Sequence, residues 1–303
     1  MLLLCGATGE LGGRVARRLA DHGAPLRLLV RRAPDAAFVE ELGADIATGD
    51  LRDARSLDRA VRGVATVVTT VTAMGRALSG VPSSVRDVDG RGTLALVDAA
   101  ERAGVERFVF VSYAGLSDAA ARRHPLAAAK RAVERRLAAS RLREVIVRPD
   151  AFQEVWLGPL AQFDWRRGRV IVLGRGDARA RYVAVDDVAA AVAAVAVADD
   201  PASWVEFGGP EPVTRNEAVA IFEDATGRAI RTIHVPRAAL RAGMRILRRA
   251  RPELASVMGL AYFADLEDAT WTDAPLTALG IRPRSVTTYA QLAGRAGARE
   301  APG

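Results

Sequence analysis

Residues 2–13 read Leu-Leu-Leu-Cys-Gly-Ala-Thr-Gly-Glu-Leu-Gly-Gly, an apolar run followed by glycines at positions 6, 9 and 12. The run Leu2 to Cys5 is too short for a helix and is typical of a buried parallel strand. Leu11, Val15 and Leu19 then recur at helical spacing, and Leu26 to Val30 forms a second apolar run. The stretch predicts a strand–helix–strand unit that contains a glycine-rich turn.

The three glycines suit a phosphate-binding turn. Gly6 permits a tight turn after the strand, Gly9 lets the backbone approach a pyrophosphate, and Gly12 lets the helix pack close to the sheet. The helix N-terminus adds free N–H groups and a partial positive charge, and Thr8 adds a hydroxyl donor. The spacing differs from the GxGxxG of the common dehydrogenases, and a glycine-rich turn without a ligand is the alternative. We expect a dinucleotide site.

The second apolar run ends in Arg31 and Arg32. An NAD site usually carries an acid here for the ribose 2′-hydroxyl, whereas an arginine favours the 2′-phosphate of NADP. Asp35 is nearby but follows the expected strand end. The sequence therefore predicts NADP(H) rather than NAD(H). Surface charge in an arginine-rich chain is the alternative interpretation of both arginines.

The amino-acid composition limits the possible domain organisation and the possible partners. The 303 residues, half of them hydrophobic, suit one large domain or one domain with a small lobe. The net charge of +7 comes from arginines scattered among acids, of which Arg245 to Arg251 is the densest run. We interpret this excess as compositional and expect no nucleic-acid partner. Lys130 is the single lysine, and a compact ammonium suits proton relays and ribose hydroxyls.

Cysteine and histidine usage gives no sign of a metal site. Cys5 is the only cysteine, and the histidines at 22, 124 and 234 lack ligand spacing. The longest apolar run, residues 188–198, is too short to span a bilayer. The first residues lack the basic region of a signal peptide. We expect no metal, a cytoplasmic protein, no membrane partner, a small-molecule substrate and a possible homodimer.

Strands and helices alternate as far as residue 150. The sequence predicts strands at 45–48, 65–70, 107–112 and 145–148, separated by helices at 36–42, 56–61, 87–103 and 125–137 and by a loop at 71–86. Alternation at this spacing is typical of a parallel sheet with helices on both faces. The expected fold class is therefore α/β, a doubly wound parallel sheet of the Rossmann type.

After residue 150 the elements become shorter. We expect strands at 165–172, 181–185, 204–207 and 230–235, and helices at 186–197, 216–226, 238–248 and 254–264, with one or two more within 276–292. These elements predict a smaller C-terminal α+β lobe that partly returns to the sheet. The expected division is 1–150 for the NADP-binding domain, 151–292 for the substrate lobe and 293–303 for a frayed tail.

An ordered set of motifs resembles the NmrA-like branch of the atypical short-chain dehydrogenases over residues 1–200. The set comprises Gly6-Ala-Thr-Gly-Glu-Leu-Gly12, Val30-Arg31-Arg32, Gly49-Asp50-Leu51, Phe110-Val-Ser112, Lys130 followed by Val133-Glu134, Val147-Arg-Pro149, and Tyr182-Val-Ala-Val-Asp-Asp-Val188. The branch includes quinone and dye reductases, isoflavone-reductase-like enzymes, photosystem assembly factors and redox-sensing regulators.

The resemblance implies a role for each part of the cofactor site. It implies a pyrophosphate site at Gly6, Thr8, Gly9, Glu10, Leu11 and Gly12, and a 2′-phosphate site at Arg31 and Arg32. It further implies adenine contacts from Asp50 and Leu51, ribose contacts from Val71 and Thr72, a nicotinamide-ribose contact from Lys130, and nicotinamide contacts from Pro149 and Phe152.

One departure from the family matters for catalysis. The standard enzymes carry a tyrosine acid four residues before the lysine, and here that residue is Leu126. The serine of the standard triad aligns with Ser112 or with Tyr113, so the catalytic candidates are Lys130, Ser112 and Tyr113. Aromatic candidates for the substrate walls, which could equally be core of the smaller lobe, are Phe152, Trp156, Phe163 and Trp165.

The missing tyrosine limits the expected chemistry. Reduction of an isolated ketone needs a proton donor for the growing alkoxide, a contribution of roughly 10²–10⁴ in rate. Quinones, enones, iminium ions and cationic dyes spread the charge and need the donor less. We therefore expect an NADPH-dependent reductase of a conjugated or quinone-like molecule. The alternative is a non-catalytic NADP(H)-binding sensor or assembly factor, and an epimerase or dehydratase is disfavoured because no second acid or base stands out.

Overall fold

The computed structural model describes residues 1–31, 36–75 and 83–300, with side chains at all of these except 36, 37 and 296–300. The chain divides into two compact units. The first contains residues 1–112, 116–148 and 188–205, and the second contains 113–115, 149–187 and 206–303. The division therefore differs from a single boundary near residue 150, because residues 188–205 return to the first unit.

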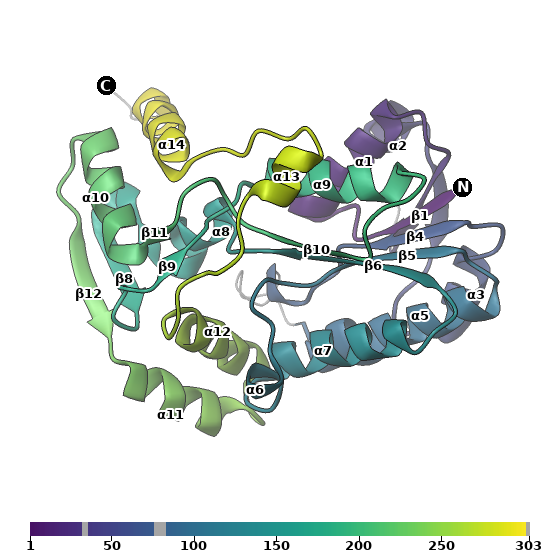
Figure 1. The fold of residues 1–303 in the computed structure, drawn as a ribbon, viewed down its shortest axis with the longest axis horizontal. Coiled ribbons are helices and arrows are strands. Elements are labelled where there is room, and N and C mark those ends of the chain that lie inside the picture. The colour runs from purple at the N-terminus through teal and green to yellow at the C-terminus, as the bar shows by residue number, and fades with distance from the viewer. Residues whose placement is uncertain (32–35, 76–82, 301–303) are drawn as a thin grey trace. The chain divides into compact units, whose positions relative to one another are not determined.

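A seven-stranded sheet forms the centre of the first unit (Figure 1). Its strand order is β10-β6-β5-β4-β1-β2-β3, and the pairs from β6 to β3 are parallel. The strands are β1 Leu2–Cys5, β2 Leu26–Val30, β3 Asp45–Thr48, β4 Thr66–Thr69, β5 Arg107–Val111, β6 Arg143–Pro149 and β10 Trp204–Phe207. This order confirms the predicted doubly wound α/β fold, and its edge strand β10 comes from residues 204–207.

Helices cover both faces of this sheet, as Figure 1 shows. They are α1 Glu10–Asp21, α2 Ala36–Leu42, α3 Ala54–Ala60, α5 Thr93–Arg102, α6 Asp118–Ala121, α7 Pro125–Ala138 and α9 Val185–Val197. A buried apolar cluster joins the sheet to α3, α5 and α7, with Phe108 and Phe110 from β5 packed among Leu57, Leu96 and Val133. The apolar runs that predicted the strands are thus the ones that form the core.

The predicted helix at 87–103 has two parts. Its first part, Arg86–Gly92, is a π-helix, and α5 follows directly. A Cβ on Gly92 would lie 2.7 Å from the Asp87 carbonyl oxygen and 2.8 Å from Cβ of Leu51, so this turn accommodates only glycine there. The wider turn places Asp89 in the protein interior. π-Helical turns of this kind are frequent at functional sites.

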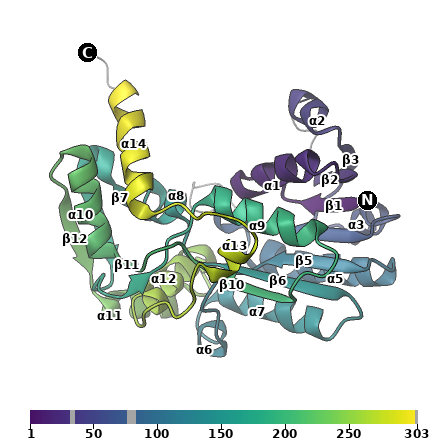
Figure 2. The ribbon, with the colours of Figure 1, turned by 45° about the horizontal axis from the view of Figure 1, so that its top comes forward.

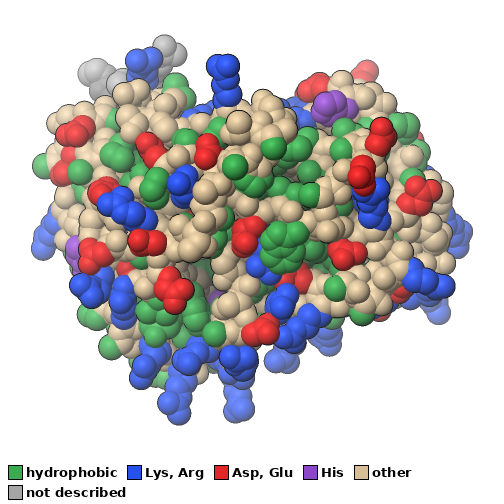
Figure 3. All heavy atoms as spheres, in the orientation of Figure 1, with side chains coloured by type: hydrophobic (Ala, Val, Ile, Leu, Met, Phe, Trp, Pro, Cys, Tyr) green, Lys and Arg blue, Asp and Glu red, His purple; other side chains and the backbone are tan. Residues whose placement is uncertain are grey.

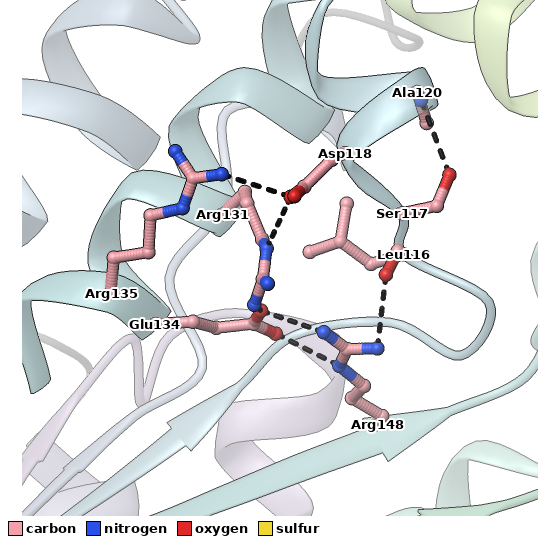
Figure 4. A network of polar contacts seen from close by, with 8 residues as sticks. All are labelled: Leu116, Ser117, Asp118, Ala120, Arg131, Glu134, Arg135 and Arg148. Atoms are coloured by element: carbon pink, nitrogen blue, oxygen red, sulfur yellow. Dashed lines mark hydrogen bonds and ion pairs between the residues drawn. The ribbon is translucent and has the colours of Figure 1, made fainter. Parts of the chain in front are cut away.

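A buried ion-pair network links α7 to β6 in the first unit (Figure 4). Arg148 donates two hydrogen bonds to the Glu134 carboxylate, at 2.9 and 2.7 Å, and a third to the Leu116 carbonyl at 3.1 Å. Arg131 also contacts Glu134, and it joins this pair to Asp118 at the surface. Two of the motifs noted in the sequence, those around Val133-Glu134 and Val147-Arg148, are therefore partners in the fold.

The second unit has smaller sheets, as the sequence predicted. One has the order β12-β8-β7 and the other pairs β11 with β9. The strands are β7 Phe163–Asp164, β8 Arg169–Leu173, β9 Arg179–Ala180, β11 Val213–Thr214 and β12 Arg231–Val235. The helices are α8 Gln153–Trp156, α10 Arg215–Thr226, α11 Arg237–Leu247, α12 Pro252–Ala264, α13 Ala274–Ala278 and α14 Val286–Glu300, and α14 packs against α10 (Figure 2).

Three expected elements of this unit differ from the structure. Residues 165–167 of the expected strand at 165–172 form a 3₁₀ turn, because the Asp164 carboxylate caps the Arg167 N–H and Gly168 follows at φ +63°. The strand expected at 181–185 is absent from the described structure, where α9 already begins at Val185. Helix α14 continues to Glu300 through most of the stretch expected to fray.

The described residues can be compared with two kinds of feature, membrane-spanning helices and metal-binding clusters. Among the residues that the structure describes, none of the helices has both the length and the apolar character needed to cross a membrane. Over the same residues, no cluster of three or more histidine, cysteine or acidic side chains is arranged to hold a metal ion.

Candidate functional site

The glycine loop between β1 and α1 has the form that the sequence predicted. Gly6 adopts φ +101°, which favours glycine, and its carbonyl accepts the Gly9 N–H at 2.9 Å. A Cβ on Gly12 would lie 2.0 Å from that carbonyl oxygen and 2.8 Å from Oγ1 of Thr70. The loop conformation therefore requires glycine at positions 6 and 12.

Gly9 has a different role from the other two glycines. A Cβ on Gly9 would meet only the Gly6 carbonyl, at 3.3 Å, so packing within the protein does not require glycine here. Gly9 is also the N-cap of α1, and no side chain caps that helix. Its first N–H groups, with exposed Thr8 and Glu10 beside them, are left for an external acceptor. A dinucleotide pyrophosphate fits this surface, since it needs both the space and the donors.

The adenosine side of the expected site is basic. Arg31 is exposed directly after β2, and Arg32 lies outside the described residues. Asp50 follows β3 and accepts hydrogen bonds from Arg52, at 3.0 Å from Nε and 2.7 Å from Nη2. The hydrogen bonds from Arg52, assisted by the charge of Arg31, lower the pKa of Asp50 to about 2. Arg52 thus adds an exposed guanidinium that the sequence interpretation missed.

The remaining expected contacts of the adenosine half are partly internal. Leu51 is buried and belongs to the core below the sheet, so little of its surface is available to a ligand. Val71 packs against the glycine loop, because a Cβ on Gly6 would lie 3.2 Å from its Cγ2. Thr72 is exposed, and its Oγ1 accepts the Met74 N–H at 3.2 Å.

Lys130 is buried on α7 rather than displayed on the helix surface. Its Nζ donates to the Val111 carbonyl at the end of β5, at 2.9 Å, and lies 4.8 Å from the ring centre of Phe110. Asp89 of the π-helix places Oδ1 3.8 Å from the same Nζ. An ammonium has three donors, and only one of them makes a hydrogen bond among the described residues. Lys130 can therefore donate to a ligand without giving up its anchor.

Asp89 is the second charged member of this buried pair. Its Oδ2 accepts the Ala73 N–H at 2.8 Å, whereas its Oδ1 has no hydrogen-bond partner in the described structure. Burial raises the pKa of Asp89 and lowers the pKa of Lys130, while their mutual attraction opposes both shifts. Each group therefore keeps its charge chiefly because the other is present.

Ser112 supplies a buried polar group directly after the strand that anchors Lys130. The residue is buried, its N–H bonds the Val147 carbonyl at 2.8 Å, and its Oγ has no protein partner among the described residues. Ser112 follows directly after Val111, which holds Lys130. A buried hydroxyl without a partner at the carboxyl end of a parallel strand is suited to bind a ligand. Leu126, in the position of the family tyrosine, is buried on the same face of α7 as Lys130.

The other expected ligand contacts belong to the second unit. Tyr113 is half-buried and belongs to that unit, whereas Lys130 and Ser112 belong to the first unit. Pro149 is buried, and its carbonyl accepts the Ala114 N–H at 2.9 Å. Phe152 is half-buried at the N-terminus of α8.

Two of the aromatic residues considered for the substrate walls are core instead. Phe163 is completely buried and meets Phe222 edge to face at 5.1 Å between ring centres, and Trp165 is buried 5.7 Å from the same ring. These side chains are therefore not available to a substrate. Trp156 packs against this core as a partly buried residue, and its carbonyl accepts a 2.7 Å hydrogen bond from Arg215.

Asp89 and Arg52 are the charged groups that the sequence interpretation did not assign. Arg52 follows directly after the Gly49-Asp50-Leu51 motif, so its sequence position offered a signal. Asp89 stands in a stretch of alternating charges and glycines, which is equally typical of an exposed helix face. Only the π-helical turn distinguishes it from its neighbour Asp87, which is half-buried and paired with Arg91.

Comparisons with known proteins relate this chain to a family and to curated relatives. A family model described as NAD(P)H-binding matches residues 6–200. The chain is 30% identical over 247 residues to the photosystem II assembly factor Ycf39 of Synechocystis sp., covering 79% of this chain and 72% of that protein. It is 32% identical over 232 residues to the (4-alkanoyl-5-oxo-2,5-dihydrofuran-3-yl)methyl phosphate reductase of Streptomyces griseus, covering 76% of both. The alignment with Ycf39 of Cyanophora paradoxa, at 39% identity, covers 37% of this chain and only 33% of that protein.

Solved structures share the fold over nearly the whole chain. An NADPH-dependent quinone oxidoreductase from Escherichia coli superposes with a TM-score of 0.75 at 20% identity, covering 97% of this chain and 99% of that one. The triphenylmethane reductase of Citrobacter sp., solved with NADP(H), gives 0.74 at 18% identity, covering 97% and 100%. At these identities the likeness establishes the fold and leaves the activity open.

Proposed function

Because the chain belongs to the NAD(P)H-binding family of NmrA-like, atypical short-chain dehydrogenases, we propose that it is an NADPH-dependent reductase of a conjugated or quinone-like small molecule. The cofactor supplies the hydride when it is bound. The preference for the 2′-phosphorylated form rests on Arg31, with Arg52 close to the same end of the site. The glycine loop would hold the pyrophosphate through the N–H groups of α1.

The observation that carries the proposal is the buried set formed by Lys130, Asp89 and Ser112. Structural lysines are rarely buried, and among the described residues this one keeps an unused donor, while the Ser112 hydroxyl that follows its anchoring strand has no partner. Lys130 would hold a ribose hydroxyl and Ser112 would hold the acceptor oxygen of the substrate. Burial lowers the pKa of Lys130 and the charge of Asp89 opposes this shift, so we expect the ammonium to stay charged as a hydrogen-bond donor.

The leucine at position 126 selects among acceptors. A phenol at this place would supply a proton as the hydride arrives, and Leu126 cannot. Substrates that spread the incoming charge over a conjugated system need that proton later. The Streptomyces griseus relative is named as a reductase, which supports turnover in this group of proteins.

The decisive experiment is an NADPH oxidation assay with a panel of quinones, enones and cationic dyes. We expect turnover of at least one acceptor, loss of roughly 10²-fold or more in kcat for Ser112→Ala, and an unchanged Kd for NADPH in that variant. Ser117→Ala is the matched control, since Ser117 is an exposed helix cap whose Oγ accepts the Ala120 N–H. Equal rates for both serine variants would contradict the assignment of Ser112.

A non-catalytic NADP(H)-binding sensor or assembly factor is the second candidate. It is favoured by the resemblance to Ycf39 over 79% of this chain and by the absence of the family tyrosine at Leu126. Tight binding of NADPH with no oxidation above the blank, across the whole acceptor panel, would favour this function over the reductase.

A further inference from the structure

The most basic stretch of the chain is unexplained by the cofactor site. Residues 237–251 contain six arginines and no acidic residue. Helix α11 covers Arg237–Leu247, and the other three arginines, at 248, 249 and 251, follow before α12. A run with this charge attracts an acidic partner, whatever the composition of the rest of the chain.

One face of α11 is occupied by α12. Leu240 and Met244 are buried, and a Cβ on Gly243 would lie 2.4 Å from Sδ of Met258 in α12. Arg237 also belongs to this face, because it pairs with Asp265 at the end of α12. Packing and one ion pair therefore fix the orientation of α11 within the second unit.

The opposite face of α11 is exposed and apolar. Ile246 has 74% of its surface exposed, the largest value among the exposed large apolar side chains of the described residues. Ala242 precedes it by one helical turn and Ala239 by two, and both are exposed. Burial of this exposed aliphatic side chain against a partner would be favourable.

Arginines border this apolar strip. Arg241, Arg245, Arg249 and Arg251 are all exposed, and none of them forms an ion pair within the described part of the chain. Figure 3 shows basic side chains gathered at the lower left edge of the view, where Figure 1 places α11. Helix α11 thus exposes an apolar strip formed by Ala239, Ala242 and Ile246. Beside it lie arginines that form no ion pair among the described residues.

This combination fits the surface of an anionic bilayer better than a nucleic acid. Interfacial helices place arginines at the headgroups and aliphatic side chains at the acyl boundary. Nucleic-acid surfaces add aromatic side chains for stacking or amide and hydroxyl groups for base edges, and residues 237–251 contain neither. An exposed isoleucine gains nothing from a phosphate backbone.

We propose that the exposed face of α11 binds the surface of an anionic membrane, with Ile246 inserted at the acyl boundary and Arg241, Arg245 and Arg249 on the lipid headgroups. This binding is separate from reductase activity and requires no membrane-spanning helix. It replaces the sequence-level interpretation of Arg245 to Arg251 as compositional, and it revises the expectation of no membrane partner.

The test is co-sedimentation of the full chain with vesicles at low salt. Vesicles of about one-third phosphatidylglycerol in phosphatidylcholine should bind the protein, and pure phosphatidylcholine vesicles should not. Each arginine near an anionic leaflet contributes roughly fivefold, so Arg241→Ala with Arg245→Ala and Arg249→Ala should lower binding roughly hundredfold. Ile246→Ser should lower it roughly tenfold, since burial of the aliphatic side chain is lost.

A matched triple variant tests whether vesicle binding depends on the arginines at the exposed face of α11 or on net charge alone. Arg169→Ala, Arg231→Ala and Arg282→Ala remove three exposed arginines from the same unit outside α11 and should leave vesicle binding within about twofold. NADPH affinity, measured in parallel, verifies that each variant is folded. Equal loss in both triple variants, equal binding to neutral vesicles, or tighter binding to duplex DNA than to the anionic vesicles would overturn the proposal.

Discussion

Asp89→Asn tests whether a buried carboxylate maintains the charge of Lys130. The substitution is nearly isosteric, and an amide oxygen can still accept the Ala73 N–H that Asp89 holds at 2.8 Å. It removes the negative charge 3.8 Å from Nζ of Lys130. The backbone anchor of Lys130 at the Val111 carbonyl is unaffected. The variant therefore changes electrostatics and leaves the packing of the site in place.

The size of the effect follows from this distance. Two unit charges 3.8 Å apart attract by about 4 kcal/mol at an effective dielectric constant of 20. Removing one partner of a buried pair typically lowers the free energy of unfolding by about 3–5 kcal/mol, because the other charge is left uncompensated. Lys130 escapes part of this cost by releasing its proton, because its pKa falls further below the ordinary lysine value than in the wild type, where Asp89 opposes the effect of burial.

The assay is a titration of NADPH affinity against pH. A charged donor contributes about 1 kcal/mol more to a hydrogen bond than a neutral one, so loss of the Lys130 proton should weaken NADPH roughly fivefold. Affinity is present below the pKa of Lys130 and is lost as pH rises through it. Since Asp89→Asn lowers that pKa, the loss should occur at lower pH than in the wild type.

Asp87→Asn is the matched control for this titration. Asp87 lies two residues earlier in the same π-helix but is more exposed and pairs with Arg91. We expect its pH dependence to match the wild type and its stability to fall by at most about 1 kcal/mol. If the affinity of Asp89→Asn falls at the same pH as that of the wild type, Asp89 does not hold the charge of Lys130.

Three further variants test other parts of the structure. Arg31→Asp should weaken NADPH roughly 10–100-fold and NADH much less, as measured by calorimetry, because only the former carries the 2′-phosphate. Glu134→Gln should lower the free energy of unfolding by about 3–5 kcal/mol in urea melts, since it leaves the buried Arg148 without its carboxylate. Gly9→Ala should weaken NADPH without destabilising the fold, whereas Gly12→Ala should destabilise it by more than about 2 kcal/mol, because its Cβ would lie 2.0 Å from the Gly6 carbonyl oxygen, against 3.3 Å for a Cβ on Gly9.

The fold was largely predictable because its strands are encoded locally. Runs such as Leu2–Cys5 and Arg107–Val111 are buried on both faces and bounded by turns, so periodicity identified them. The 3₁₀ turn at 165–167 was not predictable in this way. It depends on a side-chain cap from Asp164 and on a positive φ at Gly168, while the apolar residues around it continue a strand-like pattern.

The site was predictable where one segment forms it and less so elsewhere. The glycine loop lies within Gly6 to Gly12, so its spacing carried the signal. The partner of Lys130 lies 41 residues earlier, and nothing local separates Asp89 from an exposed acid. Similarly, an aromatic residue in the second unit has the same local sequence character whether it lines a cavity or, like Phe163, packs against Phe222.

On helix α7, the leucine that replaces the standard tyrosine lies on the same buried face as the lysine. Leu126, Lys130 and Glu134 follow one another at four-residue spacing and are all buried on one face of the helix. The two charges on this face have opposite partners on other elements, Asp89 of the π-helix for Lys130 and Arg148 of β6 for Glu134, and such pairing is the condition under which burial is tolerated. A proton that leaves Lys130 breaks this pairing and leaves Asp89 as a buried anion without a counter-charge. The lysine is therefore suited to hold its proton rather than to release it during hydride transfer, which agrees with the proposed conjugated acceptors, since these need no proton at that step.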